Sequence, residues 1–295
     1  MARRVPRALG GKVIAITGGG RGIGRATAAA LLARGARVAL GDIESDLAER
    51  TAAELGSGML GLPLDVTDRA SFTAFLDQVE AHLGALDVLI NNAGIMPVGR
   101  FVEEADACAE RIIDINVKGV IFGSKLAIER FAPRGRGHLV NIASIAGRVG
   151  TAGGATYSAS KFAVVGLSEA LHQELRGTGV AVSVVIPIGT NTELYSGVTQ
   201  VRGFRTPEPE DVADAIVATL ERPRLEVYVP PAIGLLVRTG ALLPRRAADA
   251  VSRLLGGDKA LTNPDRVKRA AYEARIMRSV EPESQAGRTD EPLVR

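Results

Sequence analysis

The sequence has little cysteine, no histidines at ligand-like spacing and no apolar run long enough to cross a bilayer. A single cysteine, Cys108, excludes an internal disulfide framework and a cysteine-based zinc site. The three histidines, His82, His138 and His172, do not form any of the common metal-binding motifs. The most apolar stretch, 227–243, is broken by prolines and an arginine well short of the roughly 20 residues that a spanning helix needs.

The chain also lacks a strong excess of charge of one sign. Its 36 Lys and Arg residues against 33 Asp and Glu give a net charge of +3, which excludes the basic stripe typical of nucleic-acid binding. The basic segment Met1–Gly11 has no apolar core like that of a signal peptide, so we expect a cytoplasmic protein. With 46% hydrophobic and 23% charged residues, the composition is that of an ordinary globular domain.

Short apolar segments alternate with longer amphipathic ones as far as about residue 230. The apolar segments predict strands at Lys12–Thr17, Arg37–Gly41, Gly61–Leu64, Val88–Asn91, His138–Ile142, Val180–Ile186 and Glu226–Val229. The amphipathic segments predict helices at Gly24–Arg34, Ser45–Leu55, Asp68–His82, Glu104–Phe131, Ala155–Arg176 and Pro209–Leu220. This order predicts an α/β fold with a doubly wound parallel sheet, whose ligands collect outside the carboxyl ends of the strands.

A glycine-rich segment, residues 17–24 (TGGGRGIG), joins the first strand to the first helix. Glycines such as Gly18, Gly22 and Gly24 let a backbone approach a pyrophosphate, and the following helix offers free N–H groups and the positive end of its dipole. Arg21 and Ile23 complete this candidate contact. Because the spacing is G-x-x-x-G-x-G rather than G-x-G-x-x-G, the turn must be wider than in the standard dinucleotide fingerprint.

Asp42 closes the second strand, 18 residues after Gly24, where a carboxylate can accept hydrogen bonds from the adenosine ribose. The same carboxylate would repel the additional phosphate of NADP, and the next residue, Ile43, brings no cation to offset it. We therefore expect NAD as the cofactor and NADP as less favoured. Arg21 is the one residue that argues for NADP, and the structural alternative for Asp42 is a solvated turn carboxylate.

The segment Tyr157-Ser158-Ala159-Ser160-Lys161, with Ser144 thirteen residues before Tyr157, carries the catalytic signal. Together with T-G-x-x-x-G-x-G and the segment 91–94 (NNAG), it resembles the short-chain dehydrogenase/reductase family. The resemblance covers about residues 10–230. It implies a seven-stranded Rossmann sheet in the order 3-2-1-4-5-6-7, a homodimer or homotetramer, and no metal.

The chemistry of the motif follows from its residue types. Tyr157 and Lys161 lie four residues apart on a helix and hence on one face, so the ammonium is expected to lower the pKa of the phenol. Tyr157 can then act as general base or general acid, while Ser144 hydrogen-bonds the reacting oxygen. The family resemblance adds that Lys161 holds the nicotinamide ribose and that Asn116 holds a water for proton relay. Singly, each residue has an ordinary structural alternative; jointly, within this framework, the four favour catalysis.

Further cofactor contacts are implied by the resemblance alone. They are Asp65 and Val66 after the third strand, Asn92, Ala93 and Gly94 after the fourth, and Pro187, Thr190 and Thr192 after the sixth. The last loop departs from the family pattern P-G-x-V-x-T, because Ile188 replaces its glycine and Thr190 its aliphatic residue. We therefore expect a different path for that loop. The segment 193–205 that follows is the expected lid over the substrate.

The chain divides into a Rossmann and catalytic domain over 1–230, a helical extension over 231–279 and a polar tail over 280–295 that we expect to be disordered. The extension is apolar at 232–237 and 241–243, has an amphipathic pattern at 247–255 and a charged helical pattern at 265–278. Three roles stay open for it. It can line a pocket for a lipophilic substrate, contact a second subunit, or lie on a membrane surface.

These features predict an NAD(H)-dependent oxidoreductase that interconverts a secondary alcohol and a ketone, on a lipophilic or cyclic small molecule. An epimerase or dehydratase is a second possibility, but members of that type usually carry a larger C-terminal substrate domain. A catalytically silent NAD-binding regulator or scaffold of the same fold is a third. Such proteins typically lack the catalytic residues, whereas Asn116, Ser144, Tyr157 and Lys161 are all present.

Overall fold

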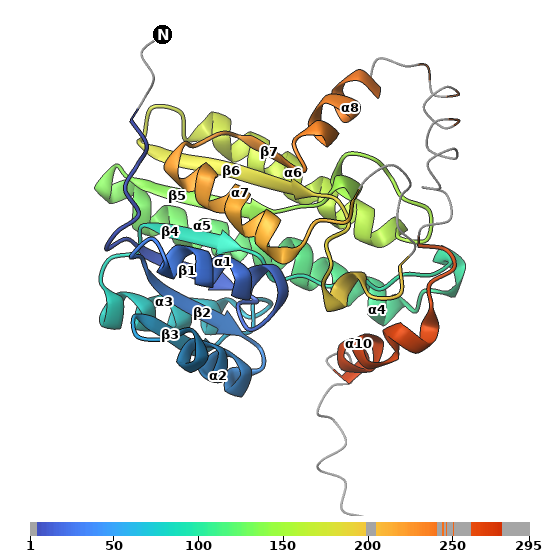
Figure 1. Cartoon of the computed structure of the whole chain (residues 1–295), viewed down its shortest axis with the longest axis horizontal. Helices are drawn as coiled ribbons and strands as arrows, with labels where there is room; N and C mark the ends of the chain where they lie inside the picture. Colours follow the sequence, from blue (N-terminus) through green and yellow to red (C-terminus); the bar gives the residue numbers. More distant parts are fainter. Residues whose placement is uncertain are drawn as a thin grey trace, which may run out of the picture.

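The computed structural model describes residues 5–198, 205–240 and 261–278, together with positions 244, 246 and 250. Its centre is a seven-stranded, fully parallel sheet in the order β3-β2-β1-β4-β5-β6-β7 (Figure 1). The strands are β1 Val13–Thr17, β2 Arg37–Asp42, β3 Met59–Pro63, β4 Val88–Asn91, β5 Gly137–Ile142, β6 Val180–Pro187 and β7 Glu226–Val229. The predicted strands and their order are confirmed, and Asp42 is the last residue of β2, as expected.

Helices cover both faces of this sheet (Figure 1). They are α1 Gly22–Leu32, α2 Ser45–Leu55, α3 Arg69–Leu83, α4 Asp106–Ile113, α5 Gly119–Phe131, α6 Ala155–Glu174 and α7 Pro209–Glu221. Buried side chains of α1, α2 and α7 pack with one set of strand residues, and those of α3 and α5 pack with the alternate set. The doubly wound arrangement is therefore confirmed.

Side chains along β1 alternate between the two hydrophobic cores, which lie on opposite faces of the sheet. Ile14 and Ile16 belong to the cluster of α1 and α7, whereas Val13 and Ala15 belong to the cluster of α3 and α5. All four are buried, since a parallel sheet covered on both faces buries both sides of each strand. This explains why the strands read as continuous apolar runs rather than as an alternation of polar and apolar residues.

The long helix predicted over 104–131 is interrupted. A short 3-10 turn, Phe101–Glu103, precedes α4, and a π-helical turn, Asp114–Lys118, separates α4 from α5. The amide of Asn116, inside that turn, is bonded to the backbone of Ile95 rather than exposed to solvent. Such π-turns occur mostly inside α-helices and frequently at functional sites.

The C-terminal extension is helical where it is described. Helix α8, Ala232–Gly240, follows β7, and α10, Arg266–Arg278, confirms the charged helical pattern of the sequence. Figure 1 shows α10 next to α4, and the position of Glu273 near Cys108 supports that placement. Within the described residues, no helix is long and apolar enough to cross a membrane. The tail at 280–295 and, apart from position 250, the helix expected at 247–255 lie outside the described residues.

Candidate active site

One large cavity opens at the carboxyl ends of the strands, where the loops after β1, β2, β4, β5 and β6 meet. Its volume is about 1480 Å³. Ligand pockets commonly enclose roughly 300–1,000 Å³, so this cavity has room for more than one small molecule. Most of the exposed surface that lines it is apolar. The position of the cavity is the one that the doubly wound topology predicts.

The glycine loop forms the floor of the cavity, and its close backbone contacts leave no room for a Cβ atom. Gly18 has φ +63°, and a Cβ atom there would lie 2.9 Å from the Cα of Ala93. A Cβ on Gly24 would lie 2.3 Å from the carbonyl oxygen of Gly18 and 2.8 Å from Nδ2 of Asn92. Arg21 precedes α1, so the free N–H groups of the first turn of that helix face the loop. This cradle fits the pyrophosphate of a dinucleotide.

Asn92 and Thr17 join this floor to the next loop. The backbone N–H groups of Asn92 and Ala93 both donate to Oγ1 of Thr17 at 3.0 Å. Nδ2 of Asn92 donates in return to the carbonyl oxygens of Thr17 and Gly18, each at 2.9 Å. Asn92 therefore fixes the loop after β4 against the loop after β1, and it brings Ala93 and Gly94 to the cavity wall.

The carboxylate of Asp42 lines the cavity beside the glycine loop. Its Oδ2 accepts a hydrogen bond from the N–H of Gly20 at 3.1 Å, and its Oδ1 accepts one from the N–H of Glu44 at 3.2 Å. These two bonds hold the side chain in place and leave lone pairs for a further donor. Asp42 therefore has the position and the chemistry to bind a ribose hydroxyl.

Arg21 is engaged by two carboxylates. Its guanidinium lies 2.6 Å from Oε1 of Glu44 and 3.2 Å from Oε2 of Glu193. Arg275 of α10 pairs with the same two groups, at 2.7 Å from Glu193 and 3.9 Å from Glu44. Partial burial raises the pKa of Glu193, but Arg275 and Arg21 together hold it below the ordinary value.

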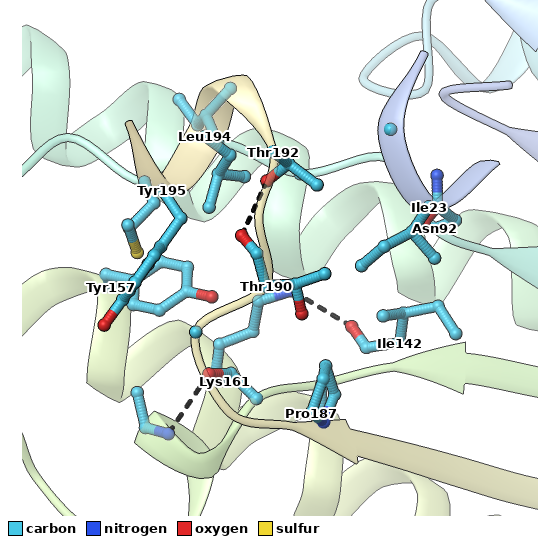
Figure 2. A pocket seen from close by; sticks show the side chains of 18 of the residues that line it. Ile23, Asn92, Ile142, Tyr157, Lys161, Pro187, Thr190, Thr192, Leu194 and Tyr195 are labelled. Carbon is cyan, nitrogen blue, oxygen red and sulfur yellow. Dashed lines mark hydrogen bonds between the residues drawn. The ribbon is translucent and has the colours of Figure 1, made fainter. Parts of the chain in front are cut away.

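Tyr157 and Lys161 lie together at the other end of the cavity (Figure 2). Ser144 lines the cavity as well. The ammonium of Lys161 donates to the carbonyl oxygen of Ile142 at 3.0 Å and lies 5.8 Å from the ring centre of Tyr157. The hydroxyl of Ser144 donates a hydrogen bond to the phenol oxygen and accepts one from the N–H of Ala146 at 3.2 Å. The predicted shared face of Tyr157 and Lys161 is therefore confirmed.

The expected depression of the Tyr157 pKa is wrong. Burial raises the pKa of Tyr157 to about 12, and the hydrogen bond from Ser144 opposes only part of this rise. Burial also lowers the pKa of Lys161 to about 8. At neutral pH the site pairs a neutral phenol with an ammonium.

Asn116 lies behind this group rather than on the cavity wall. Its Oδ1 accepts from the N–H of Ile95 and its Nδ2 donates to the carbonyl oxygen of Ile95, both at 2.9 Å. Nδ2 also donates to Oγ of Ser160 at 3.1 Å. A Cβ on Gly94 would lie 3.2 Å from Oδ1 of Asn116 and 3.5 Å from Nζ of Lys161. Asn116 thus ties the catalytic helix α6 to the loop after β4.

In the loop after β6, local contacts hold Gly189 and Thr190 in place. The glycine of this loop stands one position later than in the family pattern, and the ring of Tyr195 fills the space that a Cβ on Gly189 would occupy. Thr190 is buried, and its carbonyl oxygen accepts from the N–H of Thr192 at 2.7 Å. It also accepts from Oγ1 of Thr192 at 3.3 Å, the bond drawn in Figure 2. Thr190, Thr192 and Pro187 all line the cavity.

The predicted residues thus gather at one cavity. Gly18, Arg21, Gly22, Ile23, Asp42, Ile43, Asp65, Val66, Asn92, Ala93, Gly94, Ser144, Tyr157, Lys161, Pro187, Thr190 and Thr192 line it, and Gly24 and Asn116 lie directly behind its wall. One of the three roles open for the extension is to line a pocket, and Leu261, Tyr272, Arg275 and Ile276 do line this cavity, although the sequence does not single them out. The only available signal was the apolar pair Tyr272 and Ile276, four residues apart in a charged helix.

Comparisons with known proteins show the family of the chain. A family model described as short chain dehydrogenase matches residues 12–202. The chain belongs to the short-chain dehydrogenase family. This dehydrogenase is therefore an oxidoreductase on a Rossmann fold that binds a nicotinamide dinucleotide.

Two curated relatives and one solved structure are similar to this chain over most of its length. A 2-(S)-hydroxypropyl-CoM dehydrogenase of Xanthobacter autotrophicus is 40% identical over 232 residues, which are 72% of this chain and 90% of that protein. A 3-alpha-(or 20-beta)-hydroxysteroid dehydrogenase of Mycobacterium tuberculosis is 36% identical over 211 residues, which are 70% of this chain and 81% of that protein. A short-chain dehydrogenase/reductase of Burkholderia phymatum in complex with NAD has a TM-score of 0.72 at 27% identity, covering 79% of this chain and 93% of its own.

We predict that Gly24→Ala weakens dinucleotide binding by at least about tenfold, because the new methyl group must displace the Gly18 carbonyl or the Asn92 amide. Titration of NADH fluorescence measures the dissociation constant. Gly166→Ala is the matched control, since a Cβ there meets nothing within 4 Å. That variant should bind normally, because alanine only improves helix propensity at an open position. Equal binding by the two variants would contradict the proposed role of the loop.

Proposed function

We propose that this dehydrogenase is an NAD(H)-dependent oxidoreductase that interconverts a secondary alcohol and a ketone on a lipophilic or cyclic substrate. The observation that carries the proposal is the placement of a buried phenol, Tyr157, near Ser144 and the Lys161 ammonium, in the same cavity as the glycine cradle. The names of the two curated relatives, both dehydrogenases of hydroxylated molecules, support the reaction class.

The residues present fit a dinucleotide along the whole cavity. The loop around Gly18 and Gly22 would hold its pyrophosphate, Asp42 the adenosine ribose, and Lys161 the second ribose. When bound, the cofactor supplies a hydride to a carbonyl carbon or takes one from an alcohol carbon. The apolar wall near Tyr157, which includes Met96 and Ile188, favours a substrate with little charge.

Tyr157 is the residue that transfers the proton. With a pKa raised to about 12, its phenol is protonated at neutral pH and donates the proton to the ketone oxygen during reduction. During oxidation the phenol first releases its proton to solvent. The Lys161 ammonium stabilises the resulting phenolate, which then accepts the alcohol proton. Ser144 donates to the same oxygen and holds it against the phenol. Asn116 acts as a positioning residue, because its amide fixes Ile95 and Ser160 next to this group.

Preference for NAD over NADP rests on the charges around the adenosine end. Asp42 and Glu44 both line that part of the cavity, and a 2′-phosphate placed there would meet two carboxylates. Arg21, the one cation that argued for NADP in the sequence, is paired with Glu44 and Glu193. The pairing weakens that argument, because a new anion would have to compete with two carboxylates for the guanidinium.

We predict that Tyr157→Phe lowers kcat by about 100- to 10,000-fold, the usual contribution of a general acid or base. The dissociation constant for NADH should stay within about threefold, since the ring remains. Tyr228→Phe is the matched control, because Tyr228 lies under α8 and not on the cavity wall. Turnover is followed by NADH absorbance with cyclic and aliphatic secondary alcohols and their ketones. Normal turnover by Tyr157→Phe would overturn the assignment, and NADH binding without turnover by the wild type would favour the regulator.

We predict that the wild type uses NAD with a kcat/KM at least about 100-fold above that for NADP, because juxtaposed like charges cost several kcal/mol. The double variant Asp42→Ala/Ile43→Arg should narrow this ratio by at least about tenfold, since it removes the repulsion and adds a cation. Asp46→Ala removes an exposed carboxylate close by in the chain that does not line the cavity, and should leave the ratio unchanged. Comparable wild-type kcat/KM values for NAD and NADP would contradict the proposed preference for NAD.

A further inference from the structure

Helix α10 lies beyond the family match, which ends at residue 202, yet it forms part of the cavity wall. Arg269 holds it there. The guanidinium of Arg269, which is fully buried, donates to the carbonyl oxygens of Met96 at 2.8 Å, Ser196 at 2.9 Å and Leu194 at 3.2 Å. It also pairs with Glu273 at 3.0 Å. One side chain thus joins α10 to the loop after β4 and to the segment after β6.

The segment that leads into α10 is anchored at the catalytic helix. Leu261 packs on the glycine turn before α6, where a Cβ on Gly153 would lie 2.4 Å from the carbonyl carbon of Leu261. Leu261 is also buried in one apolar cluster with Met96 and Tyr157. The wall formed by α10 is therefore fixed relative to the reacting phenol.

Tyr272 is, with Arg275, one of two polar side chains that α10 presents at this wall. Its side chain is only 6% exposed and lines the same cavity as Tyr157. The hydroxyl oxygen accepts a hydrogen bond from the N–H of Met96 at 2.7 Å. Among the described residues, no acceptor takes the hydroxyl proton. A buried hydroxyl normally uses both its donor and its acceptor capacity. We therefore expect a bound ligand to accept this proton.

The surroundings of Tyr272 keep it a hydrogen-bond donor. Burial raises the pKa of its phenol, so the proton stays on at physiological pH. The guanidinium groups of Arg269 and Arg275 lie 5.1 and 5.6 Å from its ring centre, and their positive charge favours donation to an oxygen. The neighbouring cavity residues Met96, Leu261 and Ile276 are apolar, so the hydroxyl lies on a mainly apolar wall whose other polar groups are Arg275 and Tyr157.

We propose that Tyr272 is a specificity-determining residue whose hydroxyl donates a hydrogen bond to a second oxygen of the substrate, one that Tyr157 does not serve. The substrate class is then an apolar, ring-like alcohol or ketone that carries an additional keto, ether or carboxylate oxygen. This inference rests on the proposed function. It adds the recognition of a second functional group to the hydride transfer at the first.

The test compares ketones that share a skeleton and differ by one oxygen. The pairs are cyclohexanone with 4-methoxycyclohexanone, and 5α-androstan-3-one with 5α-androstane-3,17-dione. In at least one pair the wild type should favour the oxygenated ketone about tenfold in kcat/KM, the value of a typical hydrogen bond. In Tyr272→Phe the loss for that ketone should exceed the loss for its partner by about tenfold and appear in KM. Tyr228→Phe should change neither member.

Equal losses for both members of each pair in Tyr272→Phe would overturn the proposal, because they would mean that Tyr272 acts only by supporting the Met96 loop. No loss at all would also overturn it. Calorimetric binding of the same ketones to the NADH-loaded protein separates this result from failure of the proposed reaction. If no ketone is turned over, the proposed function fails, while a tenfold binding difference that Tyr272→Phe removes still supports the second hydrogen bond.

Discussion

The burial of the Lys161 ammonium is the constraint on which the active site depends. A buried cation is costly unless it is hydrogen-bonded, and here the carbonyl oxygen of Ile142, the last residue of β5, accepts from it. That bond joins α6 to the end of β5, one helical turn from Tyr157. Gly94 matters for the same reason, since a Cβ there would lie 3.5 Å from the ammonium. The position of the ammonium therefore depends on the end of β5, on α6 and on the absence of a side chain at Gly94.

The sequence predicted the sheet and most of the cavity because both follow from short-range patterns. Buried parallel strands are continuous apolar runs, and the candidate cofactor contacts stand at the ends of those runs. Asp42, for example, is the last residue of β2. The wall made by α10 was not predictable in this way. Tyr272 reaches the cavity only because Arg269 folds a distant helix back onto Met96, and no local pattern encodes that contact.

The sign of the Tyr157 pKa shift was missed for a related reason. Helical spacing correctly placed Lys161 beside the phenol, but spacing contains no information about desolvation. Burial weakens both charged forms, so it raises the pKa of Tyr157 and lowers that of Lys161. The consequence for catalysis is a protonated acid next to a cation at neutral pH, which suits proton donation to a ketone. In the oxidation direction the same burial makes the Lys161 charge essential.

The most direct test of this account is an NMR titration of the full chain labelled at lysine Cε and tyrosine Cζ, which is practical because the sequence has six lysines and four tyrosines. We predict one lysine with a midpoint at about pH 8 that disappears in Lys161→Met, and a Tyr157 resonance, assigned with Tyr157→Phe, that does not titrate below pH 10. Titration of every lysine above about pH 10, or of Tyr157 before Lys161, would contradict the buried ammonium and the protonated phenol on which the mechanism rests.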